Sequence, residues 1–346
     1  MKTTFYTEKE LIEQKALDAL SLFDSQDRIE KISVFPDIHF CSERSIPVGV
    51  AFKTTEVFYP LITGKDMGCG VAYLQLNKED CLRFDKSKHY RAFEKESQSM
   101  TDEGLGGGNH FLSLEEDNKF LYIIVHTGSR NLGIQMYQEN YSLIQEHNKG
   151  QAFLPLELAT KEYVNKYNAI LKYAAKRREE FLFNTLEFLR KNHYVNPSST
   201  YKVNDSVHNL LEFTEDGVIH RKGSTQLIDD KPVVIPLSMS RGSLIVRANI
   251  WDKRTEESLF SCSHGAGRQY SRTDTLKHWY SLKKSEKEKY KERFSELLNR
   301  NGDFDSSIIQ EFDFAYKSND RILFDQPYLI MIAQTKPIVT VKMTAI

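Results

Sequence analysis

The sequence predicts a single large mixed α/β domain that spans residues 1–346. Short runs rich in β-branched residues, each bounded by turn residues, predict strands at Val48–Phe52, Val71–Leu76 and Leu121–Val125. The longest helical pattern follows at about 156–192, where no glycine or proline interrupts the chain. No linker rich in proline, glycine or serine separates these segments. We therefore expect the strands and helices to form one α/β unit.

Composition excludes several classes of protein. Hydrophobic residues make up 40% of the chain and aromatic residues 12%, which excludes a disordered protein. No apolar run approaches the roughly 18–20 residues that span a bilayer, and the N-terminus is too charged for a secretory signal. The net charge of −1, from 47 Lys+Arg and 48 Asp+Glu, argues against nucleic-acid binding by bulk electrostatics but permits a local basic groove. The four cysteines form no CxxC pair, so we expect a reduced, soluble, cytoplasmic protein.

The helical segment at about 156–192 is predicted to be an excursion from the domain. Its apolar side chains recur in steps of three and four, with one gap at Arg178. A segment of this length favours two helices or a bent hairpin over one rod. Its cluster Lys176-Arg177-Arg178 is typical of a solvated basic face, and contact with phosphates is the alternative.

The last third of the chain is predicted to contain one charged helix and two strands. The helix spans about 282–298 and ends before the turn signal Asn301-Gly302. The strands lie at Tyr328–Ile332 and Ile338–Lys342, separated by Lys336-Pro337.

Asp66 and Cys69 form the first candidate metal motif, in the glycine-containing turn KDMGCG. A carboxylate and a thiol three residues apart can point to one side of a turn and share an ion. A thiolate can bridge two metals, and a carboxylate favours a hard divalent ion such as Mn²⁺ or Mg²⁺. The alternative is a turn in which Asp66 caps the backbone and Cys69 is a small buried hydrophobic residue.

Three further segments place histidines beside glycines or polar residues. Three glycines precede Asn109 and His110 and let the backbone approach a ligand closely. His126 follows a buried-looking strand and precedes Thr-Gly-Ser-Arg, whose amides, hydroxyls and Arg130 guanidinium suit a phosphate. His208 is the weakest of these candidates, because a polar residue at a helix edge would give the same pattern. A hydrogen-bonded histidine beside a glycine turn is the alternative at His110.

His264 is the candidate nucleophile. It lies between small residues in SCSHGAGR, so its imidazole is uncrowded, and Arg268 and Arg272 follow at spacings of four and eight. This combination suits a histidine that accepts a phosphoryl or nucleotidyl group beside a phosphate clamp. The alternative is a glycine-rich turn with surface arginines.

Taken together and in order, the motifs PDIH, KDMGCG, GLGGGNHF, HTGSRNLG, HN, HRKGS, SCSHGAGRQYSR, AYK and a terminal VK resemble the RtcB-type RNA ligase family. The resemblance extends from about Pro36 to Lys342. It implies a single α/β catalytic domain with a central metal cleft that holds two manganese ions. It also implies a GTP-dependent ligase that joins RNA 3′-phosphate or 2′,3′-cyclic phosphate ends to 5′-hydroxyl ends in RNA repair.

The resemblance assigns a role to each candidate residue. Cys69 would bridge both ions, with Asp66 and His110 in one site and His126 and His208 in the other. His264 would attack the α-phosphorus of GTP to form a histidine–GMP adduct, with its ring oriented by Asp37. Nucleotide contacts would come from Asn109, Ser243, Ala266, Gly267, Tyr316 and Lys342, and RNA contacts from Arg130 and Arg272.

Some positions depart from the family pattern. Ser113 stands where the family usually has a glutamate able to pair with guanine, and Leu237 and Ser240 replace glycines near the nucleotide. These departures predict a relaxed nucleotide preference. They also leave two other functions open: a guanylyltransferase that caps 3′-phosphate ends without joining them, and an inactive metal-containing RNA-binding subunit. Intact Cys69 and His264 favour the enzymes. The RNA that is repaired, any activator protein and the oligomeric state are not predicted.

Overall fold

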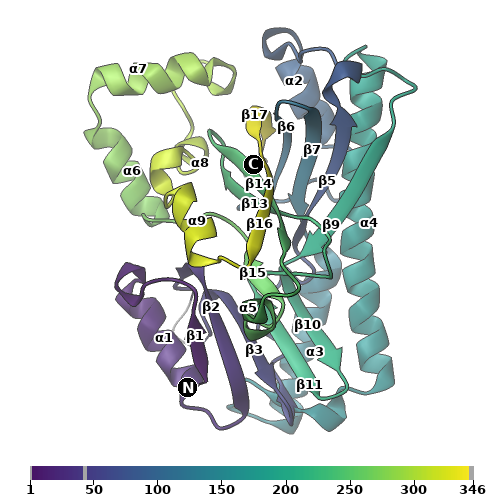
Figure 1. Cartoon of the computed structure of the whole chain (residues 1–346), viewed down its shortest axis with the longest axis vertical. Helices are drawn as coiled ribbons and strands as arrows, with labels where there is room; N and C mark the ends of the chain where they lie inside the picture. Colours follow the sequence, from purple (N-terminus) through teal and green to yellow (C-terminus); the bar gives the residue numbers. More distant parts are fainter. Residues whose placement is uncertain (1, 42–44, 343–346) are drawn as a thin grey trace.

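Two five-stranded sheets form the framework of the computed structural model, which describes residues 2–41 and 45–342 (Figure 1). The first sheet has the order β1 (Thr3–Phe5), β2 (Ile29–His39), β3 (Val48–Thr54), β11 (Gly217–Lys222), β10 (Asn209–Thr214). The second has the order β17 (Lys336–Val341), β6 (Phe111–Glu116), β7 (Phe120–Thr127), β5 (Gly70–Asn77), β9 (Tyr201–Val207).

Smaller sheets and helices complete the fold. A three-stranded sheet contains β13 (Val233–Ser238), β14 (Gly242–Ala248) and β16 (Leu329–Gln334), and two strand pairs join β12 (Ser224–Gln226) to β15 (Ser261–Ser263) and β4 (Val57–Phe58) to β8 (Leu154–Pro155). The helices are α1 (Gln14–Asp24), α2 (Lys86–Ser97), α3 (Asn131–His147), α4 (Lys161–Lys191), α5 (Lys253–Glu257), α6 (Arg272–Ser281), α7 (Lys284–Arg293), α8 (Ser306–Ile309) and α9 (Asn319–Asp325).

The second five-stranded sheet is covered on both faces. Leu74, Ile123 and Val125 point to one face and join a core cluster with side chains of α4. The intervening residues point to the other face, where Tyr73 and Ile124 pack with side chains of β13 and β14. Because both faces are buried, these strands read as nearly continuous apolar runs. The predicted α/β fold class and the three strands predicted in the first half are confirmed.

The long helical segment forms one helix, α4, so the expectation of two helices or a bent hairpin is wrong. Thr160 caps its N-terminus, with its hydroxyl accepting from the Tyr163 N–H at 3.2 Å. The helix packs along β5 and β7 (Figure 1). The expected solvated basic face is also wrong, because Arg177 and Arg178 are buried and Arg178 fills the gap in the apolar pattern.

The Arg178 side chain of α4 binds groups on three segments of the second five-stranded sheet and its loops. Its guanidinium pairs with Asp205 of β9 at 2.5 and 2.9 Å, and donates to the Gly68 carbonyl at 2.7 Å and the Thr127 carbonyl at 3.0 Å. Both carbonyls belong to segments that carry candidate metal ligands. A buried arginine therefore connects α4 to these two segments.

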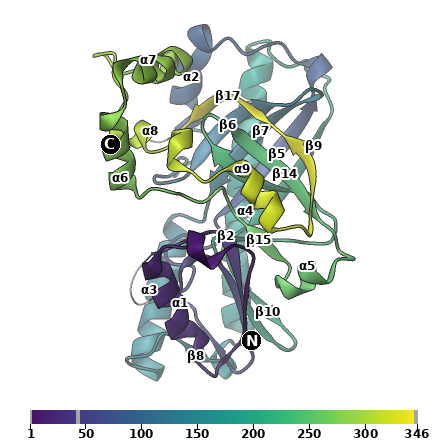
Figure 2. The ribbon, with the colours of Figure 1, turned by 60° about the vertical axis from the view of Figure 1, so that its left-hand side comes forward.

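The C-terminal elements match their predicted positions with small differences. The charged helix predicted at about 282–298 is shorter, at Lys284–Arg293. The last strand, β17, includes Lys336 and Pro337, and a register shift between Pro337 and Val339 accommodates the proline. Helices α6 to α8 form a small lobe with its own apolar cluster, which includes Trp279 (Figure 2).

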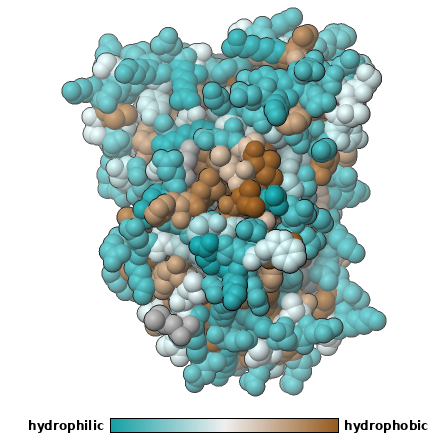
Figure 3. Space-filling view, viewed as in Figure 1, coloured by the Kyte–Doolittle hydropathy of each residue, from teal (hydrophilic) through white to brown (hydrophobic). Residues whose placement is uncertain are grey.

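The molecular surface is mostly polar on the face in Figure 3, apart from an apolar patch over the region of β14 and β16. Ile330, Met331 and Ile332 of β16 are exposed there. Within residues 2–41 and 45–342, we find no helix with the length and apolar character needed to cross a membrane.

We predict that His220 makes stability depend on pH. Its ring is fully buried, stacks on Phe52 and accepts the Tyr59 N–H at 2.9 Å, and burial lowers its pKa to about 3. An unfolded histidine titrates near pH 6.5, so below that pH the unfolded state binds a proton that the native state does not. The unfolding free energy should therefore fall by up to about 1.4 kcal/mol per pH unit from pH 6.5 toward 3.

Urea titrations in EDTA at pH 7, 6 and 5 test this dependence against a His220→Gln variant. At pH 7 the variant should have a lower unfolding free energy than the wild type. This difference should shrink as the pH falls, because every other histidine is present in both proteins and its contribution cancels. A difference that stays constant over this range would contradict the prediction.

Candidate active site

The ends of three neighbouring strands bring candidate metal ligands together. Gly70 of β5 pairs with Thr127 of β7 and with Val207 of β9. Cys69, His126 and His208 adjoin these three paired residues. The sheet register therefore places their side chains at one end of the sheet. His208 is also the single residue between β9 and β10, where the chain passes from one five-stranded sheet to the other.

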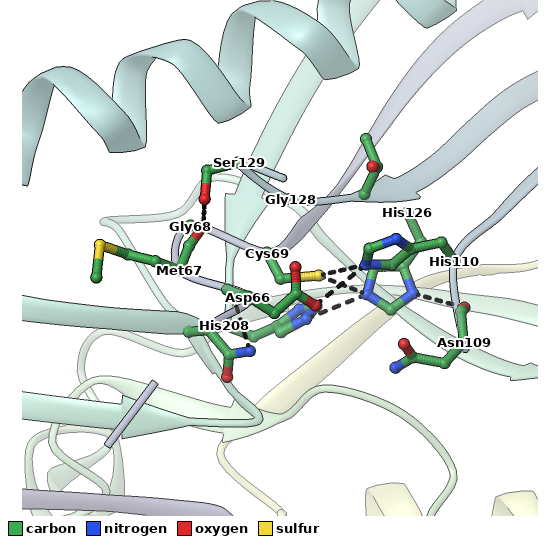
Figure 4. Close-up of polar contacts among 12 residues, drawn as sticks. Asp66, Met67, Gly68, Cys69, Asn109, His110, His126, Gly128, Ser129 and His208 are labelled. Atoms are coloured by element: carbon green, nitrogen blue, oxygen red, sulfur yellow. Dashed lines mark hydrogen bonds and ion pairs between the residues drawn. The ribbon is translucent and has the colours of Figure 1, made fainter. Parts of the chain in front are cut away.

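The Cys69 thiol contacts the imidazole rings of two histidines (Figure 4). Its Sγ is 3.3 Å from His110 Nε2 and 3.1 Å from His126 Nε2, and the donor atoms of these three buried residues lie within 4.8 Å of one another. Two further candidate ligands adjoin these three residues. Asp66 Oδ2 lies 3.1 Å from His110 Nε2, and His208 Nε2 lies 3.2 Å from His126 Nε2.

The histidines present the nitrogens that a metal needs. His126 Nδ1 lies 3.1 Å from the Asn109 carbonyl and must donate to it, which leaves a lone pair on Nε2 beside the thiol. Burial, followed by the charges of neighbouring histidines, lowers the pKa of His126 and His208 well below 6.5. Both rings are therefore neutral at pH 7.

The two acidic groups respond differently to their surroundings. Burial favours the neutral form of Asp66, but the hydrogen bond and charge of His110 outweigh it and hold its pKa at about 2. Burial and the Asp66 carboxylate raise the pKa of the Cys69 thiol. A bound metal reverses that balance, because a coordinating thiol is deprotonated. One sulfur, three imidazole nitrogens and a carboxylate therefore form a donor set suited to a divalent transition metal.

Glycine is required beside this group. A Cβ on Gly128, which follows β7, would lie 2.4 Å from Asp66 Oδ1 and 3.2 Å from Cys69 Cα. Any side chain at this position would displace the turn that holds both ligands.

The imidazole of His264 lies next to this donor group. It follows β15, and its ring centroid is 5.0 Å from that of His208. His264 Nδ1 lies 2.6 Å from Asp37 Oδ2, which also accepts the backbone N–H groups of His264 and Gly265 at 2.8 and 3.2 Å. Because this carboxylate oxygen accepts, Nδ1 carries the proton and Nε2 keeps its lone pair. Asp37 is fully buried and fixes the ring in that orientation.

A cavity of about 980 Å³ opens onto His264 and His126. Residues expected to bind the nucleotide or RNA line it: Asn109, Ser243, Ala266, Gly267, Arg272, Tyr316 and Lys342. Arg130 does not belong to this lining. It lies at the N-terminus of α3, where a Cβ on Gly106 would come within 2.8 Å of its guanidinium. The same Cβ would lie 2.5 Å from His110 Nδ1, so the Arg130 guanidinium lies close to a candidate metal ligand.

The structure adds two glutamates to the cavity that sequence reasoning missed. Glu311 is buried, pairs with Lys342 at 2.8 Å, lies 3.5 Å from Arg272 and accepts from the Tyr316 hydroxyl. Nothing in the local sequence of Glu311 indicates its pairing with Lys342 and Arg272, because both lie in other segments of the chain. Glu115 is also buried, and its signal is its position two residues after Ser113, on the same face of β6.

Comparisons with known proteins give one consistent family. A family model described as tRNA-splicing ligase RtcB matches residues 75–343. The chain is 24% identical to RNA-splicing ligase RtcB2 of Escherichia coli strain ATCC 25922, over 96% of this chain and 93% of that relative. It is 27% identical to RNA-splicing ligase RtcB of Escherichia coli K12, over 90% of each chain. The tRNA-splicing ligase RtcB of Aeropyrum pernix is 26% identical over 63% of this chain and 54% of its own.

We predict that Arg178→Met destabilises the protein by about 2–5 kcal/mol, because it leaves the Gly68 and Thr127 carbonyls without their buried donor, at about 1–3 kcal/mol each, and also removes the pair with the partly exposed Asp205. Urea unfolding at pH 7 measures the loss. Lys176→Met, two residues earlier on the exposed side of α4, is the matched control and should change stability by no more than about 0.5 kcal/mol. Equal effects of the two substitutions would contradict the structural role of Arg178.

Proposed function

The chain belongs to the RtcB family of RNA-splicing ligases, and from this membership we propose that it joins RNA ends through a covalent histidine–GMP intermediate. One observation carries the proposal. The imidazole of His264 is fixed by Asp37 at Nδ1, with its ring 5.0 Å from that of a candidate metal ligand and facing a cavity large enough for a nucleotide.

The proposed metal centre holds two manganese ions. Cys69 Sγ contacts one member of each of two donor pairs, Asp66 with His110 and His126 with His208, so the thiolate suits a bridging position. When bound, the ions supply positive charge that neutralises the triphosphate oxygens. Asp37 holds the proton on Nδ1 and stabilises the positive charge that develops on the His264 ring.

His264 supplies the nucleophile of the proposed first step. Its Nε2 attacks the α-phosphorus of GTP, an N–P bond forms, the bond to the β-phosphate oxygen breaks, and pyrophosphate leaves. Asn109, Ser243, Tyr316 and Lys342 hold the nucleotide, with the backbone at Ala266 and Gly267.

RNA is the second substrate. Water opens a 2′,3′-cyclic phosphate to a 3′-phosphate, whose oxygen attacks the adduct and takes the GMP from His264. The 5′-hydroxyl of the other strand then attacks the activated phosphate, forms the phosphodiester and expels GMP. Arg130 and Arg272 are the proposed contacts for the RNA backbone, and RNA repair is the proposed role.

We predict that the protein, incubated with Mn²⁺ and α-labelled GTP, becomes labelled in a form that is stable to base and labile to acid. His264→Ala should remove the label because the attacking atom is gone, while His147→Ala on the exposed surface of α3 should retain it. Gel analysis of the protein measures the label. A wild-type protein that acquires none would refute the proposed reaction.

The same incubation with RNA ends separates the enzymatic outcomes. Strands bearing a 3′-phosphate and a 5′-hydroxyl should be joined. A strand that carries GMP at its 3′ end but is never joined would indicate a capping guanylyltransferase instead. RNA binding without adduct or product would indicate an inactive subunit.

We predict that Cys69→Ala loses both manganese ions, because it removes the ligand shared by the two donor pairs. Metal analysis after gel filtration in Mn²⁺-containing buffer measures the stoichiometry. Cys81→Ala, a half-buried cysteine outside the donor group, should keep the wild-type content. Stoichiometric manganese in the Cys69 variant would rule out the bridging role.

A further inference from the structure

Glu115 is a buried carboxylate on the wall of the nucleotide cavity. Only 3% of the residue is exposed, yet it contributes to the cavity lining. Within the parts of the chain that the structure describes, no lysine or arginine forms an ion pair with it. A buried carboxylate without a cation is costly, so its presence in the wall of a ligand cavity points to a role in binding.

Three hydroxyl groups hold the Glu115 carboxylate in place. Ser113 donates to Oε1 at 2.9 Å, Ser243 donates to Oε1 at 3.2 Å, and Thr335 donates to Oε2. An ionised carboxylate offers about four acceptor sites, so one remains open. The Ser243 contact is one of two to Oε1 and the longer of them, and it can give way to a ligand at little cost.

The position of Glu115 follows from strand periodicity. Phe111, Ser113 and Glu115 point to the same face of β6, and Glu115 lies about 6.6 Å further along the strand than Ser113. His264, Phe111, Lys342, Ser243 and Glu115 all line the same cavity. Because both residues line one cavity of about 980 Å³, we expect a nucleotide with its α-phosphorus at His264 to reach Glu115 with its base.

We propose that Glu115 is a specificity-determining residue that selects guanine, by accepting hydrogen bonds from adjacent N–H groups of the base. The proposal rests on the proposed guanylylation of His264. Guanine presents N1–H and a 2-amino group side by side, and both can donate to one carboxylate. Adenine presents an unprotonated N1 at the corresponding edge, which repels a carboxylate. Glu115 would thus supply the carboxylate that the serine at position 113 lacks. On this proposal we expect a strict preference for GTP instead of the relaxed preference expected from Ser113 alone.

The test measures adduct formation with GTP, inosine triphosphate and ATP. Wild-type protein should prefer GTP over ATP by at least roughly 100-fold in kcat/KM, because a polar pocket strongly rejects a base that leaves its buried groups unpaired. Inosine triphosphate, which keeps N1–H but lacks the 2-amino group, should fall between them.

Glu115→Gln should lower the preference for GTP over ATP at least tenfold, mainly through a higher KM for GTP, with unchanged manganese content. Glu116→Gln, whose side chain lies on the opposite face of β6 and pairs with Lys78, is the matched control and should keep the wild-type preference. An unchanged preference in Glu115→Gln would overturn the inference.

The wild-type measurements decide the question even if Glu115→Gln does not fold. Equal use of GTP and ATP by the wild type, with an adduct on His264, would refute guanine selection while leaving the proposed ligase reaction intact. Absence of an adduct with every nucleotide would refute the proposed function, and the inference with it.

Discussion

The contact of the Cys69 thiol with His110 and His126 is the interaction on which the site depends. The sulfur lies 3.3 and 3.1 Å from their Nε2 atoms, at the end of a sheet buried on both faces. The register of β5, β7 and β9 fixes where these side chains meet, because Gly70 pairs with both Thr127 and Val207. A shift of one residue in this register would turn each side chain to the other face and separate the donors.

Two buried charged side chains, Arg178 and Asp37, connect the site to other elements of the fold. Arg178 ties α4 to the Gly68 and Thr127 carbonyls, so the long helix supports the segments that carry the donor group. Asp37 reaches His264 from β2 of the other five-stranded sheet and aligns its ring beside His208. One five-stranded sheet therefore contributes the donor group, and the other contributes the carboxylate that orients the imidazole. The chain passes from one sheet to the other at the single residue between β9 and β10.

Local patterns predicted the strands and the residue types of the site, since strand periodicity and glycine turns depend on residues that are close together in the sequence. Tertiary partners were not predictable in this way. Arg178 looked like part of a solvated face because its partner, Asp205, is 27 residues away on another element. Ser113 suggested a missing carboxylate, and the carboxylate of Glu115 became visible only once β6, β14 and Thr335 were seen together. Resemblance to a known family linked the separate motifs, and the structure shows which of them lie side by side.

Anomalous diffraction at the manganese edge, from crystals grown with Mn²⁺, is the most direct test of the proposed centre. We expect two peaks on either side of Cys69 Sγ, one within coordination distance of Asp66 and His110 and the other of His126 and His208. Peaks remote from the sulfur, or no peak within reach of these five side chains in a manganese-saturated crystal, would contradict a thiolate-bridged centre beside His264.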